Sequence, residues 1–286
     1  MENSKIQWTD ATWNPWHGCT KVSAGCKNCY MYRDKAKYGQ DGSTVQRSKT
    51  QFTAPLKWKK PQLIFTCSWS DFFEPQADEW RAEAWEIIKQ TPQHTYQILT
   101  KRPERIKKCL PKDWIVETES RDRPLELNYP NVWLGVSVEN QQTAEERIPI
   151  LNAVPAICRF ISFEPLLEMI HLSRELSNFR PWDWDLIHWI IIGGESGNDS
   201  GIHRYRRCRN SWIKVMAYPF LKNQIPVFIK QLGTHLAKEL SLKDRSGGNP
   251  DEWPANYLRF RQIPYHLIHD HRLQERYKKL KDAQNR

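Results

Sequence analysis

The sequence lacks several features that would assign it to a common class of protein. It has no run of about 18 apolar residues, so we expect no membrane-spanning helix. Its first residues, MENSKIQWTD, contain no basic segment followed by an apolar one, so we expect no secretion signal and a cytoplasmic protein. The absence of G-x-S-x-G, H-E-x-x-H and Walker motifs argues against the common hydrolases and NTPases. There is also no internal repeat.

Cysteine is scarce and unevenly distributed. The 286 residues include seven cysteines, and three of them lie within residues 18–29, GCTKVSAGCKNC, which we call the cysteine loop. An odd number of thiols in a reducing compartment argues against a disulfide framework and favours metal binding or chemistry. The net charge of +10 is compatible with a polyanionic partner, most commonly nucleic acid, or with a non-specific basic surface.

Short apolar runs alternate with helix-compatible segments along most of the chain. The runs predict strands at 62–68, 95–100, 131–138, 157–163, 188–194 and 226–231, with a possible first strand near 5–9. Helices are predicted at 77–91, 143–154 and 209–224, where Pro219 is expected to kink or end the last one. Continuous apolar strands between helices are typical of a parallel sheet covered on both faces.

These patterns predict an α/β fold. We expect a partial or full (β/α) TIM-like barrel of about six or seven parallel strands in residues 1–235, with a doubly wound sheet as the alternative. Residues 236–286 lose the strand pattern and predict a basic, helical C-terminal extension.

Each predicted strand finishes in polar or charged residues or is followed directly by them. In a parallel barrel the carboxyl ends of the strands form one rim, and this rim carries the active site. We therefore expect a shared polar site there, although strands also give way to solvated loops. The residues concerned are Ser70, Asp71, Lys101, Arg102, Ser137, Glu139, Asn140, Ser162, Glu164, Glu195, Lys230 and Gln231.

The C-x6-C-x2-C spacing of Cys19, Cys26 and Cys29 suits metal coordination. The C-x2-C pair allows two thiolates to bind one centre from a tight turn, and Gly25 allows the chain to fold back toward Cys19. One interpretation is a structural zinc site with His17 as the fourth ligand. The other is a [4Fe–4S] cluster held by three thiolates, which leaves one iron open for an exogenous ligand.

The cysteine loop follows the possible first strand and precedes the helix-compatible segment YMYRDKAKYG. In this position it resembles the cluster loop of radical S-adenosylmethionine (radical SAM) enzymes, which are partial or full (β/α) barrels with three cluster cysteines after strand one. Their usual spacing is C-x3-C-x2-C. This chain keeps the second gap, has six residues in the first, and has Asn28 where an aromatic residue usually precedes the last cysteine.

A closer resemblance covers residues 8 to 231. Its blocks, in order, are WTDATWNPWHGCTKVSAGCKNCY, SWSDFF, QHTYQILTKRPER, NVWLGVSVENQQTAEERIPIL, RFISFEPLL, IIIGGESG and PVFIKQLG. They resemble a bacterial and phage family of unassigned function, named after phage reading frames thirty-seven and sixty-eight, whose members look radical-SAM-like. This resemblance supplies no substrate.

The resemblance implies a [4Fe–4S] cluster on Cys19, Cys26 and Cys29, with S-adenosylmethionine bound at its open iron and cleaved to a 5′-deoxyadenosyl radical. It points to the following residues for cofactor binding: Ser70, Asp71, Ser137, Glu139, Asn140, Gly193, Gly194 and Glu195. Four further residues are candidates for binding cofactor carboxylate or substrate, or for internal ion pairs: Lys101, Arg102, Glu164 and Lys230.

The sequence therefore predicts a radical SAM iron–sulfur enzyme of unknown substrate. Nucleic acid or a nucleotide is the favoured substrate class, because of the net charge and the phage association of the resembling family. Such an enzyme also needs an electron donor, which the sequence does not identify. The alternative is a non-catalytic nucleic-acid-binding module braced by zinc or by a cluster.

Overall fold

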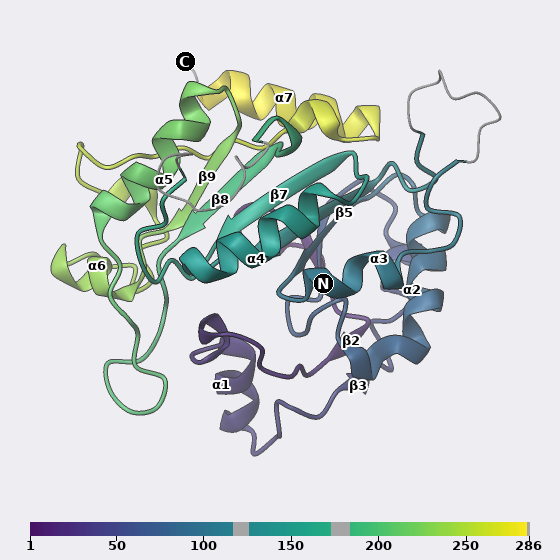
Figure 1. Cartoon of the computed structure of the whole chain (residues 1–286), viewed down its shortest axis with the longest axis horizontal. Helices are drawn as coiled ribbons and strands as arrows, with labels where there is room; N and C mark the ends of the chain where they lie inside the picture. Colours follow the sequence, from purple (N-terminus) through teal and green to yellow (C-terminus); the bar gives the residue numbers. More distant parts are fainter. Residues whose placement is uncertain (117–125, 173–183, 285–286) are drawn as a thin grey trace.

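A parallel sheet of seven strands forms the centre of the computed structural model, which describes residues 1–116, 126–172 and 184–284 (Figure 1). The strands are β1 Ala11–Trp13, β4 Leu63–Thr66, β5 Thr95–Thr100, β6 Val132–Ser137, β7 Cys158–Phe163, β8 Trp189–Gly193 and β9 Val227–Gln231. They lie in the sheet in chain order, and every neighbouring pair is parallel. The predicted α/β fold with parallel strands is confirmed.

The sheet is a curled half-barrel. Within the described residues β1 and β9 form its two edges and do not pair with each other, so the barrel is not closed. The sequential order also excludes the doubly wound alternative, in which the strand order reverses at a switch point. A separate two-stranded antiparallel sheet joins β2, Trp16–His17, to β3, Gln46–Arg47.

Six of the predicted strands are confirmed, whereas the first lies further along the chain than the sequence predicts. The prediction near 5–9 is wrong, because the first strand comprises Ala11–Trp13. Trp8 turns instead into the concave side of the sheet, where its ring centroid lies 4.6 Å from that of Phe65 and 5.8 Å from that of Trp189. The free energy gained by burying this large ring is greater than that of extending residues 5–9 into a strand.

The three predicted helices are confirmed as α2 (Asp78–Gln90), α4 (Gln141–Asn152) and α5 (Asn210–Lys222). Pro219 lies inside α5 and does not end it. The remaining helices are α1 Tyr30–Lys37, α3 Ile106–Cys109, α6 Thr234–Glu239 and α7 His271–Gln284. No helix within the described residues is both long and apolar enough to span a membrane.

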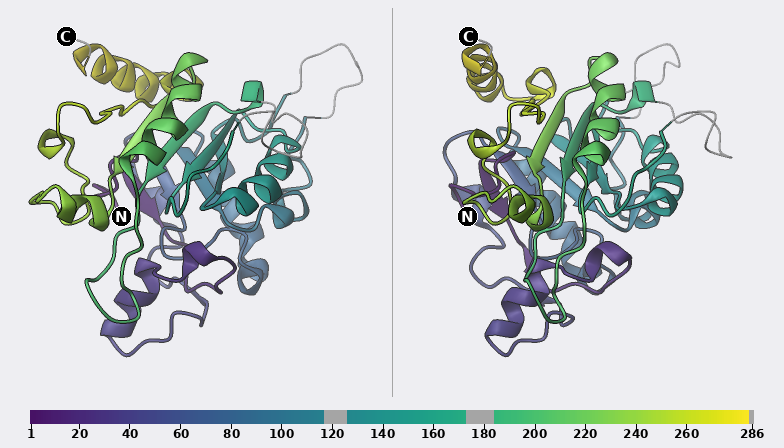
Figure 2. Two further views of the ribbon diagram at one scale, coloured as in Figure 1. Left: turned by 60° about the vertical axis from the view of Figure 1, so that its left-hand side comes forward. Right: turned by 90° about the vertical axis from the view of Figure 1, so that its left-hand side faces the viewer.

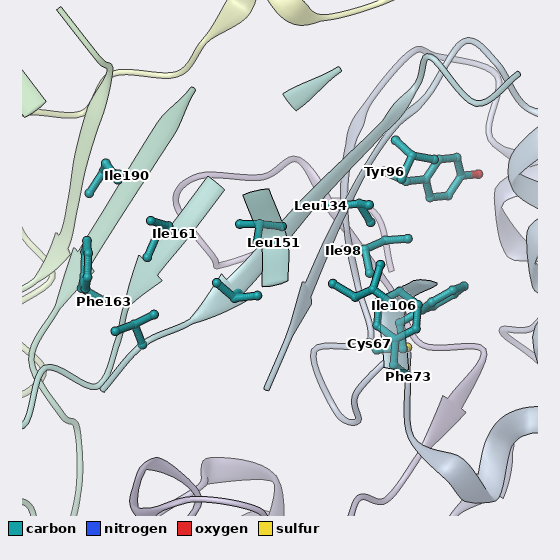
Figure 3. Packing of buried hydrophobic residues seen from close by; sticks show 14 of the residues in the cluster. Cys67, Phe73, Tyr96, Ile98, Ile106, Leu134, Leu151, Ile161, Phe163 and Ile190 are labelled. Carbon is teal, nitrogen blue, oxygen red and sulfur yellow. The ribbon is translucent and has the colours of Figure 1, made fainter. Parts of the chain in front are cut away.

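Two apolar clusters cover the two faces of the sheet. The larger cluster lies between the sheet and the helices α2, α4 and α5, and Figure 3 shows part of it around Ile98, Leu134 and Ile161. The smaller cluster fills the concave side and is rich in aromatic residues, among them Trp133 and Trp189. Alternate residues of each strand point to opposite faces, so both clusters are built from the same strands.

The C-terminal segment packs on the concave side of the sheet. Leu273 of α7 and Ile268 belong to the smaller cluster. Figure 2 shows α7 on the opposite side of the sheet from α4 and α5. Tyr277 donates a hydrogen bond to Asp10 at 3.0 Å, which ties α7 to the segment before β1. The division of the chain at residue 235 into a barrel and an extension stays a prediction.

Candidate functional site

A cavity of about 560 Å³ lies at the carboxyl ends of the strands. Its wall includes all three cysteines of the cysteine loop, residues that follow β4, β5, β7 and β8, and the last residues of β6 and β9. Its wall also includes the apolar side chains of Ile6, Trp8, Phe65 and Leu99. In Figure 1 the cysteine loop and α1 (purple) lie below the sheet, beside the loop that connects β8 to α5 (green).

The cysteine loop is irregular and brings its thiols to the cavity from three backbone settings. Cys19 follows β2, Cys26 ends a short 3₁₀ turn, and Cys29 is the residue before the first turn of α1. All three are free thiols. Burial raises the pKa of the Cys19 thiol and the nearby carboxylate of Asp71 raises it further, whereas the guanidinium of Arg102 opposes both effects.

The arrangement does not form a site for a single metal ion. Within the part of the chain that the structure describes, no three His, Cys, Asp or Glu side chains are close enough to share one ion. His17 does not line the cavity, and its Nδ1 is buried without a hydrogen-bond partner. A structural zinc site with His17 as the fourth ligand is therefore not preassembled among the described residues. Three thiols around one cavity suit a cluster, in which each thiolate binds a different iron.

Most of the polar residues predicted from the strand ends line the cavity. These are Ser70, Asp71, Lys101, Arg102, Ser137, Ser162, Glu164, Gly194, Glu195, Lys230 and Gln231. The prediction of a shared polar rim therefore agrees with where the strands end. Glu139, Asn140 and Gly193 are absent from the cavity wall.

Asp71 organises the ends of β4 and β5. Its Oδ1 accepts hydrogen bonds from Thr100 Oγ1 at 2.7 Å and from the backbone of Phe73 at 2.9 Å. Its Oδ2 accepts from the backbone of Lys101 at 2.9 Å and from Arg102 Nη1 at 3.3 Å. Both oxygens already accept hydrogen bonds from the protein. Asp71 therefore holds the ends of β4 and β5 in place and is a poor acceptor for a ligand.

Lys101 places a cation beside two of the cysteines. Its Nζ donates to Ser137 Oγ at 3.1 Å and lies 3.7 Å from Glu139 Oε1, with about a quarter of the side chain (24%) exposed. Burial lowers the pKa of Lys101, but Glu139, Cys26 and Cys29 outweigh this effect and the pKa is raised. The ammonium group therefore stays charged in the cavity.

Glu164 and Lys230 form an ion pair in the cavity wall, with 2.6 Å between Oε1 and Nζ. Gly193 lies beneath this pair, since a Cβ there would stand 3.1 Å from the Glu164 carboxylate. Gly194 has a different role, because its Cβ would lie 2.2 Å from the backbone oxygen of Leu232. Only glycine allows the chain after β8 to approach the chain after β9 so closely.

Two residues expected to bind cofactor have other contacts. Glu139 is fully buried (0% exposed) and accepts a hydrogen bond from Ser23 Oγ at 2.9 Å. Asn140 caps α4, where its side chain accepts from the Thr143 backbone at 2.9 Å. The sequence predicts this helix from residue 143, whereas α4 begins two residues earlier, at Gln141. The chain leaves β6 and turns into α4 at this point, and neither side chain lines the cavity.

Several residues at the cysteine loop are not predicted from the sequence. Three of them form ion pairs with predicted residues: Glu74 with Arg102, Arg147 with Glu139, and Arg206 with Glu195. Three others connect the loop to these pairs by hydrogen bonds: Thr20, Ser23 and Asn28. Glu74 directly follows the block SWSDFF, and Arg206 lies in the arginine-rich run 203–209. These two signals were available in the sequence, whereas nothing local marks Arg147 within its helix.

No protein of curated function matches the sequence. A solved structure of a spore photoproduct lyase double mutant, with bound AdoMet and a dinucleoside spore photoproduct, is similar at a TM-score of 0.40 and 11% sequence identity. The alignment covers 74% of this chain and 61% of that one, so this chain spans less than two thirds of its length. The naming after phage reading frames stays a prediction. The model of the family described as a protein of unknown function, DUF5131, matches residues 3–282, and the chain belongs to this family.

Proposed function

We propose that the protein is a radical SAM iron–sulfur enzyme in which Cys19, Cys26 and Cys29 hold a [4Fe–4S] cluster. The observation that supports this most is that three free thiols line one cavity at the carboxyl ends of a parallel half-barrel. The cavity volume of about 560 Å³ falls within the range of small-molecule and cofactor sites. Such a cluster is oxygen-sensitive, so the proposal includes a cytoplasmic location. It also includes an electron donor, because the cleavage of S-adenosylmethionine is reductive.

The bound cofactors would supply reductive cleavage of the S-adenosylmethionine sulfonium and hydrogen abstraction from a substrate. The cysteine thiolates would be the protein ligands of the cluster. Lys101 would balance part of their negative charge or bind a carboxylate, because its cationic group lies near Cys26 and Cys29. The Glu164–Lys230 pair would offer one acceptor and one donor to polar groups of a ligand.

The apolar part of the cavity wall would exclude water from the reacting groups. Trp8 is 2% exposed and Phe65 is 9% exposed, and both line the cavity. A dry wall strengthens the electrostatic interactions of the charged groups at the other end of the cavity. This supports a cavity with a polar, thiol-bearing end and an apolar end.

The decisive experiment is a metal and product analysis of anaerobically reconstituted protein. We expect about four irons and matching sulfide per chain, as for one [4Fe–4S] cluster, and 5′-deoxyadenosine after addition of dithionite and S-adenosylmethionine. Cys26→Ala should lose both. Cys109→Ser is the matched control, because Cys109 is a half-buried free thiol outside the cavity wall.

One zinc per chain, no iron and intact S-adenosylmethionine would refute the enzyme and favour a zinc-braced binding module. Iron bound equally by the wild type and by Cys26→Ala would refute the ligand assignment. An intact cluster without any product from S-adenosylmethionine would leave a cluster-braced module in place of the enzyme.

Nucleic acid is the substrate class that the charge distribution favours. Arg204, Arg207 and Arg209 are exposed, and within the described residues none of them is in an ion pair. Arg204 lies beside the cysteine loop, because Asn28 Nδ2 donates to its backbone oxygen at 2.8 Å, and Arg207 and Arg209 follow it closely in the chain. Cations at the edge of the cavity would attract a phosphate backbone passing over it.

The salt dependence of oligonucleotide binding tests this substrate class. Replacing the three arginines by alanine should lower the slope of log affinity against log salt by about 2, at about 0.7 per phosphate contact with a single strand. The control replaces Lys57, Lys59 and Lys60, which are exposed on the segment before β4, at the other end of the strands. Equal slopes for both triple variants and the wild type would refute a phosphate contact at the cavity.

A further inference from the structure

Three buried carboxylates, which follow three different strands of the sheet, form hydrogen bonds with the cysteine loop. Each accepts a hydrogen bond from a loop residue, and each is paired with an arginine. We call them the loop pairs: Glu74–Arg102, Glu139–Arg147 and Glu195–Arg206. Their contacts with the loop lie at residues 20, 23 and 28, so each cysteine is within two residues of a contact point.

The first loop pair fixes the backbone next to Cys19. Glu74 Oε2 accepts from the Thr20 backbone N–H at 3.0 Å and from Thr20 Oγ1 at 3.0 Å. Arg102 Nη2 donates to the Thr20 carbonyl at 2.8 Å, and its Nη1 lies 3.5 Å from Cys19 Sγ. One ion pair therefore satisfies both backbone groups of Thr20 and also contacts the neighbouring thiol.

The second loop pair lies directly under the middle of the loop. Glu139 Oε1 accepts from Ser23 Oγ at 2.9 Å, and a Cβ on Gly25 would stand only 2.4 Å from the same oxygen. Arg147 Nη1 lies 3.3 Å from both carboxylate oxygens and donates to the Ser137 carbonyl at 2.7 Å. Glycine at position 25 therefore lets the loop backbone rest on the carboxylate, one residue before Cys26.

The third loop pair connects the end of the loop to the segment after β8. Glu195 Oε2 accepts from Asn28 Nδ2 at 2.9 Å and from the Arg206 backbone N–H at 2.8 Å. Arg206 Nη1 reaches back to the loop and donates to the Ala24 carbonyl at 2.9 Å. Asn28, which stands where the related motif has an aromatic residue, is 5% exposed and uses its side chain for this contact.

We propose that the loop pairs are positioning residues that hold the cysteine loop preformed in the metal-free chain. The inference rests on the proposed cluster site. Ordering a loop costs conformational entropy at every residue, so a loop that is ordered beforehand binds its ligand more tightly. Because each carboxylate is matched by a guanidinium, the loop pairs add no net charge beside the anionic thiolates.

The competing explanation is that these ion pairs only stabilise the fold. Substitutions on the loop side separate the two explanations, because they remove a loop contact and leave the ion pair in place. The variants are Thr20→Val, Ser23→Ala and Asn28→Ala. Thr20→Ser keeps the hydroxyl and should restore wild-type behaviour. The control is Ser43→Ala, since Ser43 is exposed and its hydroxyl contacts only Asp41.

Hydrogen exchange of the metal-free protein is the first readout. In each variant we expect about 10-fold faster exchange in the peptide that covers residues 18–29, which is the effect of losing one hydrogen bond of ordinary strength. Exchange in the strands should stay at the wild-type rate. A loop that exchanges at the wild-type rate in all three variants would overturn the inference, and so would exchange that rises equally in loop and strands.

Iron release from the reconstituted protein to a chelator is the second readout. We expect release that is about 10-fold to 100-fold faster in the variants, the range seen when outer-shell partners of metal ligands are removed. Wild-type release rates in all three variants would overturn the inference. If the wild type takes up no iron, the proposed function fails, and the exchange experiment still decides whether the loop is preformed.

Discussion

The Glu139–Arg147 pair allows the energetics of the cavity wall to be tested directly. The Glu139 side chain is fully buried, and the Arg147 side chain is 6% exposed. Replacing Glu139 by alanine leaves the guanidinium buried, with the Ser137 carbonyl as its remaining hydrogen-bond acceptor among the groups described. Removing one partner of a buried ion pair costs about 3–5 kcal/mol, because the other charge is left uncompensated.

For a chain of this length each kcal/mol lowers the melting temperature by about 2–4 °C, so Glu139→Ala should lower it by roughly 6–20 °C. The double variant Glu139→Met with Arg147→Met should recover most of this loss, since replacing a buried pair by apolar side chains is often neutral. The assays are thermal unfolding for the melting temperature and urea unfolding for the free energy, both on the metal-free protein and followed by circular dichroism. A loss below about 1 kcal/mol in the single variant would refute the assignment of a desolvated pair.

Three further predictions concern the supporting structure. Gly194→Ala should lower the melting temperature and the yield of folded protein, because its Cβ would clash with the Leu232 carbonyl at 2.2 Å; a wild-type melting curve would contradict this. Burial lowers the pKa of His94, so the unfolded chain binds a proton more readily and stability should fall as the pH drops below about 6.5. His94→Gln should show a smaller loss of melting temperature between pH 7.5 and pH 5.5, and an unchanged pH dependence would exclude His94 as a cause. Leu273→Ala should cost about 2–5 kcal/mol in urea unfolding because Leu273 is 1% exposed in the concave cluster, whereas a loss near zero would mean that α7 is a dispensable extension.

The parts of the fold that sequence predicts are those set by local pattern. The strands β4 to β9 are continuous apolar runs, and each is found within a residue or two of its predicted range. The first strand is misplaced because it has only three residues, Ala11–Trp13, and the stronger apolar signal of Trp8 precedes it. The length of a strand this short is decided by pairing with β4 and not by its own residues.

Much of the cavity wall follows from the two-residue period of the strands. Phe160 points to the concave side, and continuing the alternation from it places Ser162 and then Glu164 on the same side, where both line the cavity. The same continuation from Phe228 gives Lys230. Lys230 lies within β9, and Glu164 is one residue beyond the end of β7, so the alternation extends one residue past that strand.

The rule fails where the chain turns as soon as the strand ends. By alternation from Trp133 and Ser137, Glu139 should also face the cavity, yet it lies outside the wall and under the cysteine loop. Asn140 is the N-cap of α4 and is itself extended, with φ −153° and ψ 176°, and the helix begins at the next residue, Gln141. A single sequence shows that Glu139 is an acid at a strand end and that Asn140 suits a helix cap. It does not show that the turn into the helix keeps the Glu139 side chain out of the cavity wall.

The loop contacts are the part of the site that no local pattern predicts, since each joins residues far apart in the chain. Thr20 and Glu74 are 54 residues apart, Ser23 and Glu139 are 116 apart, and Asn28 and Glu195 are 167 apart. They meet because the parallel strands all end at one edge of the sheet and the loop lies across that edge. A loop of twelve residues whose regular structure is one short 3₁₀ turn has few contacts of its own, so its shape depends on the strand ends. Acids at those ends therefore have two roles, facing the cavity and holding the loop. Glu164 has the first role, Glu139 the second and Glu195 both, and only the three-dimensional arrangement shows which role each has.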